Sequence, residues 1–424
     1  MDQNGVDHSG LKSPVAVPTV RRAALAFIFV TVLLDILAIG IVIPVLPHLV
    51  ERFLGGDTAR AALWIGGFGT AFALAQFIFS PVQGALSDRF GRRPVILLSN
   101  AGLCLDFVLM AVVNTLPLLF LGRVLAGVCS ASISTANAYI ADVVPAERRA
   151  ASFGMLGAAF GIGFIIGPAL GGVLGGIDLR LPFWVAAALS GLNFLYGLMV
   201  LPESLPVERR RAFEVKSANP LGALRLLRSY PQVGGLVIAN VLSQLAHYVL
   251  PAVFVLYAGY RYGWGQDRVG YVLALVGVCN VIVQAVLMRR LVARFGERRC
   301  LLAGLLFGSA GFVLQALAST GPMFLLAVPL LALWGLAGPS SQALITRQVA
   351  QDHQGRLQGA LTSAVSLTGV FGPATFASVF AASIAVGVSF ELPGAAFLLA
   401  AVLLLLAAGC VWRSPRTLWQ PSSA

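Results

Sequence analysis

The feature that most constrains this chain is a series of long apolar segments separated by short polar intervals. Twelve such segments can be drawn between Ala23 and Trp412, each close to the roughly 20 residues that an α-helix needs to cross a bilayer. In lipid, every backbone N–H and C=O group must be satisfied inside its own segment, so spans of this kind are helices. The chain is 58% hydrophobic and only 11% charged, whereas soluble proteins carry about 25% charge. The sequence therefore predicts an all-α polytopic membrane protein with twelve transmembrane helices.

The basic residues predict how these helices are oriented. If the N-terminus is cytoplasmic, 23 of the 29 Lys and Arg residues lie on the cytoplasmic side and 5 on the outer side, with Arg123 inside a span. Positive charges near the ends of spans are retained in the cytoplasm. The bias therefore predicts that both termini are cytoplasmic. It also explains the formal net charge of +12 as a topology signal, so we do not expect a nucleic-acid partner.

The longest polar interval divides the chain into two halves. We expect residues 203–230 to form a cytoplasmic linker between six helices in residues 23–202 and six in residues 231–412, with cytoplasmic tails at residues 1–22 and 413–424. The five cysteines fall in or beside apolar spans and are expected to be small core residues without disulfides.

The second half of the chain repeats the first. Two dipeptides recur at one offset of 205 residues: Phe90-Gly91 as Phe295-Gly296, and Gly167-Pro168 as Gly372-Pro373. One offset at two separate motifs indicates a tandem duplication, which predicts two six-helix bundles around a central cavity. The repeat is imperfect, because Asp88 corresponds to Ala293 and Arg92 to Glu297. We therefore expect energy coupling in the first bundle.

A compact charged turn separates the second and third apolar segments. It reads Gly84-Ala-Leu-Ser-Asp88-Arg89-Phe-Gly91-Arg92-Arg93 and is called the hinge below. Gly84 can give clearance between helices, Gly91 permits a tight turn, and Asp88 can face a helix N-terminus. An ordinary positive-inside loop is the alternative interpretation.

At this turn the sequence resembles the major facilitator superfamily, whose loop between helices two and three reads Gly-x-x-x-Asp-Arg-x-Gly-Arg-Arg. The resemblance implies the major facilitator fold and a gating motif formed by Gly84, Asp88, Arg89, Gly91 and Arg92. It also implies that Asp142, at the end of the fourth segment, bridges to the arginines of the turn and latches helices two, three and four. For Asp142, a solvated surface charge is the alternative.

Two carboxylates are expected near the middle of the membrane, Asp35 in the first segment and Asp106 in the third. Such groups are costly in a bilayer and face the protein interior or a wet cavity, usually beside a partner. Arg123 is the fixed cation available inside the spans. We expect Asp35, Asp106 and Arg123 to share one polar cavity and to couple transport to protons, with Asp106 as the fixed partner of Arg123 and Asp35 as the proton carrier. The alternatives are a structural Asp35 and a static Asp106–Arg123 pair.

The fifth segment is rich in small residues, which let neighbouring helix backbones approach closely. Its pattern consists of Gly154, Gly163, Gly167, Pro168, Gly171 and Gly172. The spacing resembles the antiporter signature of the superfamily, which separates exporters from sugar-type symporters. Glycine packing without any functional role is the alternative.

Uncharged polar side chains inside the spans are candidates for a substrate cavity. The residues expected to line it are Gln76, Asn137, Gln244, His247, Asn280, Gln284 and Gln342. Amides, an imidazole and aromatic rings in an apolar cleft suit a large, partly polar aromatic ligand. Hydrogen bonding between helices is the alternative for half or more of them.

Further motifs resemble the tetracycline-efflux (Tet) family over almost the whole chain. They include Asp35 with Gly40 and Pro44 in the first segment, and Gly335-x2-Gly338-Pro339-Ser-Ser-Gln342-Ala, Gln354-Gly355-Arg356-x-Gln358-Gly359-Ala and Ser366-Leu-Thr368 in the second half. Two departures stand out. Asn280 lies near the place of a helix-eight histidine of Tet pumps, and Gly308 where many carry an acid in helix nine.

The resemblance implies a monomeric drug:proton antiporter in the bacterial cytoplasmic (inner) membrane. It would export an amphiphilic drug-like compound, tetracycline or a related one, either free or as a divalent-metal chelate, with the proton gradient as driving force and no bound cofactor. The alternative is a proton-coupled or facilitated transporter of a small metabolite. The chain has no Gly-x4-Gly-Lys-Ser/Thr phosphate loop, no His/Glu metal pair and no Gly-x-Ser-x-Gly turn, so we expect neither an ATP-driven pump nor an enzyme, and no metal site.

Overall fold

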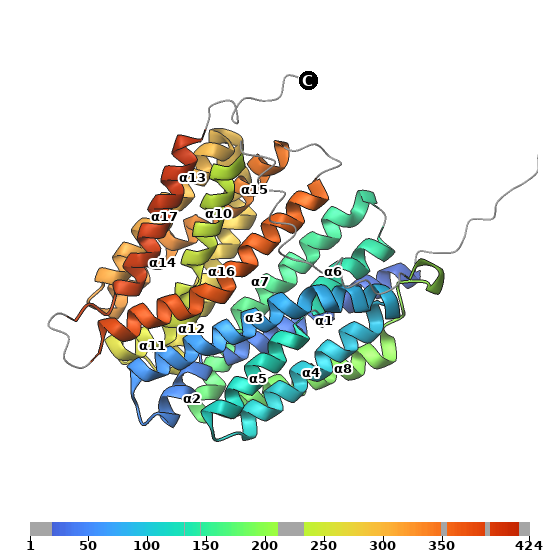
Figure 1. Cartoon of the computed structure of the whole chain (residues 1–424), viewed down its shortest axis with the longest axis horizontal. Coiled ribbons are helices and arrows are strands. Elements are labelled where there is room, and N and C mark those ends of the chain that lie inside the picture. The colour runs from blue at the N-terminus through green and yellow to red at the C-terminus, as the bar shows by residue number, and fades with distance from the viewer. Residues whose placement is uncertain are drawn as a thin grey trace, which may run out of the picture.

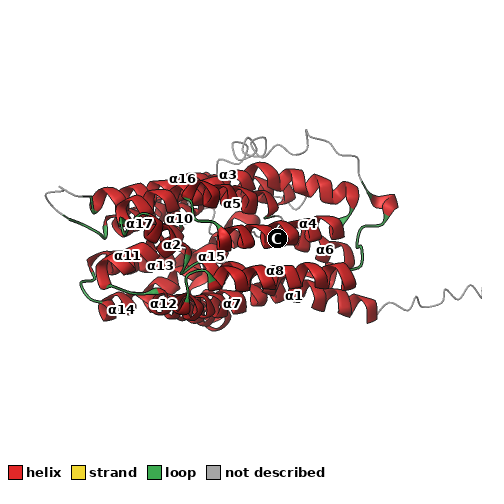
Figure 2. Ribbon diagram, turned by 90° about the horizontal axis from the view of Figure 1, so that it is seen from below, coloured by secondary structure: helices red, strands yellow, loops and turns green. Residues whose placement is uncertain are grey.

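A computed structural model describes residues 19–130, 132–144, 146–210, 233–348, 354–385 and 391–414. In these ranges the chain forms helices joined by turns, without strands (Figure 2). Ten helical stretches are long and apolar enough to cross a membrane, and Leu116–Cys129 is a shorter apolar helix. One of the ten, Gln266–Leu317, has 52 residues and reverses at Gly296, where φ is 78°. It therefore holds two spans, which brings the long stretches to eleven spans, and the shorter helix Leu116–Cys129 belongs to the twelfth.

The first bundle consists of helices whose breaks fall at predictable residues. Its helices are α1 (Thr19–Val42), α2 (Leu46–Phe53), α3 (Thr58–Phe90), α4 (Arg92–Val112), α5 (Leu116–Cys129), α6 (Ser132–Val143), α7 (Ala146–Ile177) and α8 (Leu181–Val200), followed by the short η1 (Val207–Arg209). The first span is broken into α1 and α2 beside Pro44 and Pro47, because proline cannot donate the helical hydrogen bond. Helix α1 begins inside the expected tail, and most of the expected linker and both chain ends lie outside the described residues.

The second bundle contains more irregular helices than the first. Its elements are α10 (Gly234–His247), α11 (Val249–Tyr262), α12 (Gln266–Ile282), η4 (Val283–Leu287), α13 (Met288–Leu317), α14 (Gly321–Ala332), η5 (Leu333–Leu336), α15 (Ala337–Arg347), α16 (Gln354–Ser383) and α17 (Ala395–Arg413). Element η4 is a π-helical turn and η5 is a 3₁₀ turn. Such interruptions of a helix are frequent at functional sites.

The internal repeat is visible in the backbone. Gly91 has a φ of 107° and Gly296, its counterpart at the offset of 205 residues, has a φ of 78°. A residue with a Cβ rarely adopts this conformation, so both turns need glycine. In each bundle an arginine guanidinium stacks over the phenylalanine before the glycine, at 5.1 Å for Arg89 and 5.6 Å for Arg294. The predicted duplication is thereby confirmed.

The two bundles touch mainly through two pairs of helices, α3 with α16 and α7 with α12, and α11 makes smaller contacts with α3 and α2 (Figure 1). Thr70 Oγ1 donates a 2.9 Å hydrogen bond to the Val370 carbonyl, and a Cβ on Gly66 would lie 2.5 Å from the Ala377 Cβ. These contacts lie in the half of the helices remote from the hinge. The bundles are thus closed against each other at the α2 end.

Candidate functional site

The hinge between α3 and α4 is held by a network centred on Arg92. Its guanidinium NH1 binds Asp88 at 2.6 Å and its Nε binds Asp142 of α6 at 3.0 Å. Asp142 also accepts a hydrogen bond from Ser204, which follows α8. The geometry therefore favours the latch of helices two, three and four over a solvated Asp142. Gly84 does not provide helix clearance in this conformation, because a Cβ there would meet nothing within 4 Å.

Glu203 caps the first turn of α4, a role that sequence reasoning missed. Its carboxylate accepts the backbone N–H groups of Arg92 and Arg93, at 2.8 and 3.3 Å. A negative charge at a helix N-terminus is favourable, because it satisfies unpaired N–H groups and the helix dipole. Gly91 leaves the room for it, since a Cβ would lie 2.1 Å from Glu203 Oε2. At this helix N-terminus the structure therefore places Glu203, and Asp88 pairs with Arg92.

The latch recurs in the second bundle with its charges exchanged. Adding the offset of 205 to Arg92 and Asp142 gives Glu297 and Arg347, and these two residues form an ion pair at 2.5 Å. Asp88 corresponds to Ala293, so Glu297 has no acidic neighbour one helical turn earlier. Glutamate at 297, where the first bundle has arginine, is therefore matched by arginine at 347, where the first bundle has aspartate.

Asp106 and Arg123 form a buried ion pair between α4 and α5. Asp106 is fully buried, and Arg123 also contacts the Met110 sulfur at 2.7 Å. Gly122 makes the space, because a Cβ there would lie 2.7 Å from Asp106 Oδ1. Both partners line a mostly apolar cavity of about 290 Å³, together with Gln76. The predicted pairing of Asp106 with Arg123 is confirmed.

Asp35 lies apart from that pair, contrary to the expectation of one shared cavity. It is 1% exposed and accepts a 2.9 Å hydrogen bond from Asn193 of α8. Asn193 also donates to the Thr31 carbonyl of α1 at 3.1 Å, which fixes the amide against α1. The residues that line the Asp106–Arg123 cavity do not include Asp35. Among the described residues, Asp35 and Asp106 are the buried acidic side chains.

The glycines of α7 fit this helix between α1 and the second bundle. A Cβ on Gly163 would lie 2.8 Å from Ile36, and one on Gly167 would lie 2.8 Å from the Gly40 Cα. On another face, a Cβ on Gly172 would lie 2.6 Å from the Gln266 carbonyl of α12. Gly171 likewise touches α1, whereas Gly154 faces open space. Helix α7 therefore connects the helix that carries Asp35 to the contact between the bundles.

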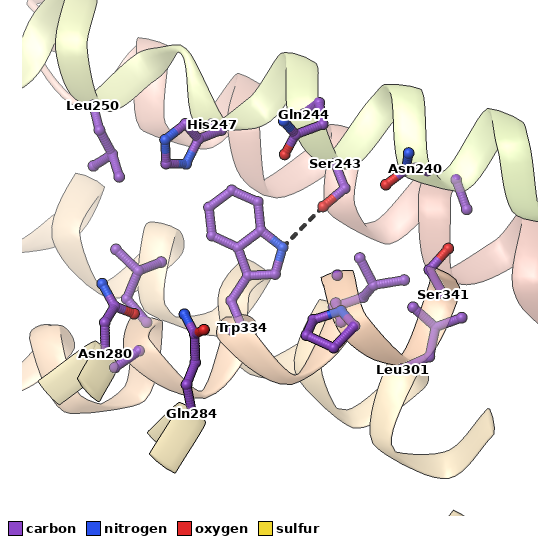
Figure 3. A pocket seen from close by; sticks show the side chains of 18 of the residues that line it. Asn240, Ser243, Gln244, His247, Leu250, Asn280, Gln284, Leu301, Trp334 and Ser341 are labelled. Carbon is purple, nitrogen blue, oxygen red and sulfur yellow. Dashed lines mark hydrogen bonds between the residues drawn. The ribbon is translucent and has the colours of Figure 1, made fainter. Parts of the chain in front are cut away.

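Four of the predicted substrate residues come together in one cavity of about 350 Å³ inside the second bundle (Figure 3). Gln244 and His247 reach it from α10, Asn280 from α12 and Gln284 from η4. Trp334 projects from η5 into the middle of the group, and its Nε1 donates a 3.0 Å hydrogen bond to Ser243 (Figure 3). We call this space the second-bundle cavity.

The other predicted substrate residues lie elsewhere. Gln76 and Asn137 line a third cavity, of about 410 Å³, between the bundles with Tyr248 and Ser366, on the hinge side of the bundle contacts. Gln342 is absent from the lining of all three cavities. The single predicted cavity is thus three spaces in this conformation. In the described ranges, no group of three or more His, Cys, Asp or Glu could hold a metal ion.

Comparisons with known proteins agree with this architecture. The tetracycline resistance protein of class C from Escherichia coli is 39% identical over 360 residues, covering 85% of this chain and 90% of that protein. The class E protein from Escherichia coli is 37% identical over 355 residues, covering 84% and 87%. The crystal structure of a D-xylose–proton symporter superposes with a TM-score of 0.74 at 19% identity, covering 93% of this chain and 98% of that one, which supports the fold alone.

The family match spans nearly the whole chain. The Major Facilitator Superfamily matches residues 28–373 and 236–424, and the two ranges together include both bundles. With twelve spans in two repeated bundles and the hinge motif at the start of α4, the chain is an integral multi-pass membrane protein that belongs to the major facilitator superfamily.

Proposed function

We propose that this protein is a secondary active exporter that exchanges protons for an amphiphilic drug-like compound, tetracycline or a related one. The observation that carries the proposal is the pair of buried carboxylates in the first bundle, Asp35 and Asp106, with Arg123 bound to one of them. Buried charges at this depth are costly and mark ion or proton pathways. The tetracycline resistance protein of class C, 39% identical over most of the chain, supports drug export.

The two carboxylates are assigned different parts. Asp106 is tied to Arg123 by a buried ion pair, so it serves as the fixed partner. Asp35 lies on α1, the helix that ends beside Pro44, and accepts a hydrogen bond from the neutral amide of Asn193. We therefore assign the coupling proton to Asp35. Helix α7 packs against α1 and also against α12. A shift of α1 that follows a change in charge at Asp35 can therefore move α7 and, through it, the contact between the bundles.

Alternating access follows from how the bundles touch. They are closed at the α2 end, and the cavity lined by Gln76 and Asn137 lies between them on the hinge side. With the hinge in the cytoplasm, as the distribution of Lys and Arg supports, this conformation takes up substrate from inside. The ion pairs of Arg92 and of Glu297 shift the equilibrium between this conformer and the one that is open to the opposite side.

We place the protein in a bacterial cytoplasmic membrane with both termini inside, working as a monomer, without enzymatic activity and without a bound cofactor. A divalent-metal chelate as the transported form stays a prediction. The second candidate, uptake of a small metabolite, is disfavoured by the glycine face of α7, which follows the antiporter spacing.

Everted membrane vesicles test the proposal. Vesicles that contain the protein should accumulate tetracycline, or another member of a drug panel, when a proton gradient is imposed, and lose the compound when the gradient is collapsed. The Asp35→Asn and Asp106→Asn variants should not accumulate it. Gradient-driven accumulation by both variants would refute the assigned carboxylates, and efflux of a sugar or amino acid in place of drugs would favour the second candidate.

A further inference from the structure

The second-bundle cavity is polar but carries no fixed charge. Among the described residues, its polar lining consists of amides, serine hydroxyls, the Trp334 indole and the His247 ring, without Asp, Glu, Lys or Arg. Amides can donate and accept hydrogen bonds with an uncharged ligand. A cation that enters such a space gives up hydration without meeting a carboxylate, and attraction to the one indole face returns only part of that cost.

Trp334 is a fixed aromatic surface in this cavity. Its Nε1 is bound to Ser243, and its ring lies 5.5 Å from Phe312 and 5.7 Å from His247 between ring centres. Behind it, a Cβ on Gly308 would lie 2.8 Å from the Trp334 Cγ. Glycine at 308 therefore leaves the space that the indole occupies. A ring held in place this way loses little freedom when a ligand stacks on it.

The residues around the indole are arranged to meet the edge of a stacked ring. Gln244 and His247 lie on one side of Trp334, and Asn280 and Gln284 lie on the other (Figure 3). Because the indole N–H is already used by Ser243, what Trp334 offers a ligand is its ring surface. The volume of about 350 Å³ lies within the range of pockets for drug-sized compounds, about 300–1,000 Å³.

We propose that the second-bundle cavity binds an uncharged, planar aromatic compound, stacked on Trp334 and hydrogen-bonded at its edge by the surrounding amides. This inference rests on the proposed function, because it names the substrate class of the exporter. It makes a cationic metal chelate a poor ligand of this cavity.

A pair of probes with one shape and two charges tests the inference. Acridine is uncharged at mildly alkaline pH, whereas N-methylacridinium is a permanent cation with the same three fused rings. Binding of each is measured to the purified full-length protein by equilibrium dialysis, without any proton gradient. We expect acridine to bind at least about tenfold more tightly, a difference of about 1.4 kcal/mol.

Variants of the aromatic surface test the stacking. Trp334→Ala should weaken acridine binding about threefold to tenfold, the range expected for the loss of one aromatic pair. Trp334→Phe should restore most of the affinity, because a ring surface remains. Wild-type affinity in Trp334→Ala would overturn the stacking, provided thermal unfolding shows that the variant is folded.

A charge placed in the cavity should invert the preference. Gln284→Glu adds a carboxylate to the lining with almost no change in shape, and should raise N-methylacridinium affinity about tenfold. Gln342→Glu adds the same charge outside the lining and should leave the affinity unchanged, which controls for attraction to detergent or to the protein surface.

The outcomes separate this inference from the proposed function. Equal or tighter binding of N-methylacridinium by the wild type, or binding of neither probe, overturns the inference. The exporter function falls only if the everted vesicles also fail to accumulate any compound of the drug panel under a proton gradient.

Discussion

Exchanging the charges of the Glu297–Arg347 pair should preserve transport, whereas reversing Glu297 alone should impair it. The first bundle already uses the exchanged order, with Arg92 on the helix after the hinge and Asp142 on the next one. Ala293 is neutral at the position of Asp88, so an arginine at 297 would meet no carboxylate other than its new partner. Glu297→Arg with Arg347→Asp therefore rebuilds the order found in the first bundle.

The size of the effect follows from the exposure of the pair. The Arg347 side chain is 64% exposed and that of Glu297 is 21% exposed, so solvent screens the attraction to about 0.2–1 kcal/mol. Glu297→Arg removes that attraction and adds a repulsion of similar size. The contact between α13 and α15 should then lose about 0.4–2 kcal/mol, which changes a two-state equilibrium roughly 2- to 30-fold.

The assay is the initial rate of drug accumulation in everted vesicles, corrected for the amount of protein in the membrane. Glu297→Arg should slow the rate severalfold, and the double exchange should return it to within about twofold of the wild type. Arg299→Glu makes the same charge change as Arg347→Asp at a neighbouring exposed position and serves as the control. A double variant as slow as Glu297→Arg would refute the role of the ion pair.

Three further predictions concern the first bundle. Gly167→Leu should block the approach of α7 to Gly40 and lower export far more than membrane expression, measured as rate per molecule; loss of folded protein would return the motif to packing alone. Asp88→Asn should slow transport sharply at unchanged expression, because its half-exposed pair with Arg92 contributes under about 1 kcal/mol to the fold, and a normal rate would reject a gating role. Glu203→Gln should lower the midpoint temperature of thermal unfolding, because the loss of the capping charge costs about 1 kcal/mol. Glu208→Gln lies outside the cap and serves as the control, which should match the wild type.

Hydropathy and a repeat offset were enough to predict the architecture. Apolar segments of spanning length have few stable arrangements in a bilayer, so the twelve helices follow from composition and spacing. The Phe-Gly dipeptides predicted the two turns, because a positive φ requires glycine wherever it occurs. The Asp106–Arg123 pair was predictable by elimination, since a buried carboxylate needs a partner and the spans offered one fixed cation.

The site was predicted less completely because its contacts join residues far apart in the chain. Asn193 is one of several amides in apolar helices, and nothing in its local sequence marks it as the partner of Asp35. The Glu297–Arg347 exchange did leave a signal, because the offset of 205 residues leads from Asp142 to Arg347. The division of the substrate residues among three cavities depends on helix rotation and on the π-turn at η4, which periodicity does not reveal.

The central claim is that a buried carboxylate of the first bundle gives up its proton when the exported compound binds. The direct measurement is proton release by the purified protein in weakly buffered solution, followed with a pH indicator on addition of acridine or tetracycline, whichever the vesicles accumulate. The wild type should release protons on binding, whereas Asp35→Asn should bind the compound and release none. Undiminished proton release by Asp35→Asn would exclude Asp35 as the proton carrier.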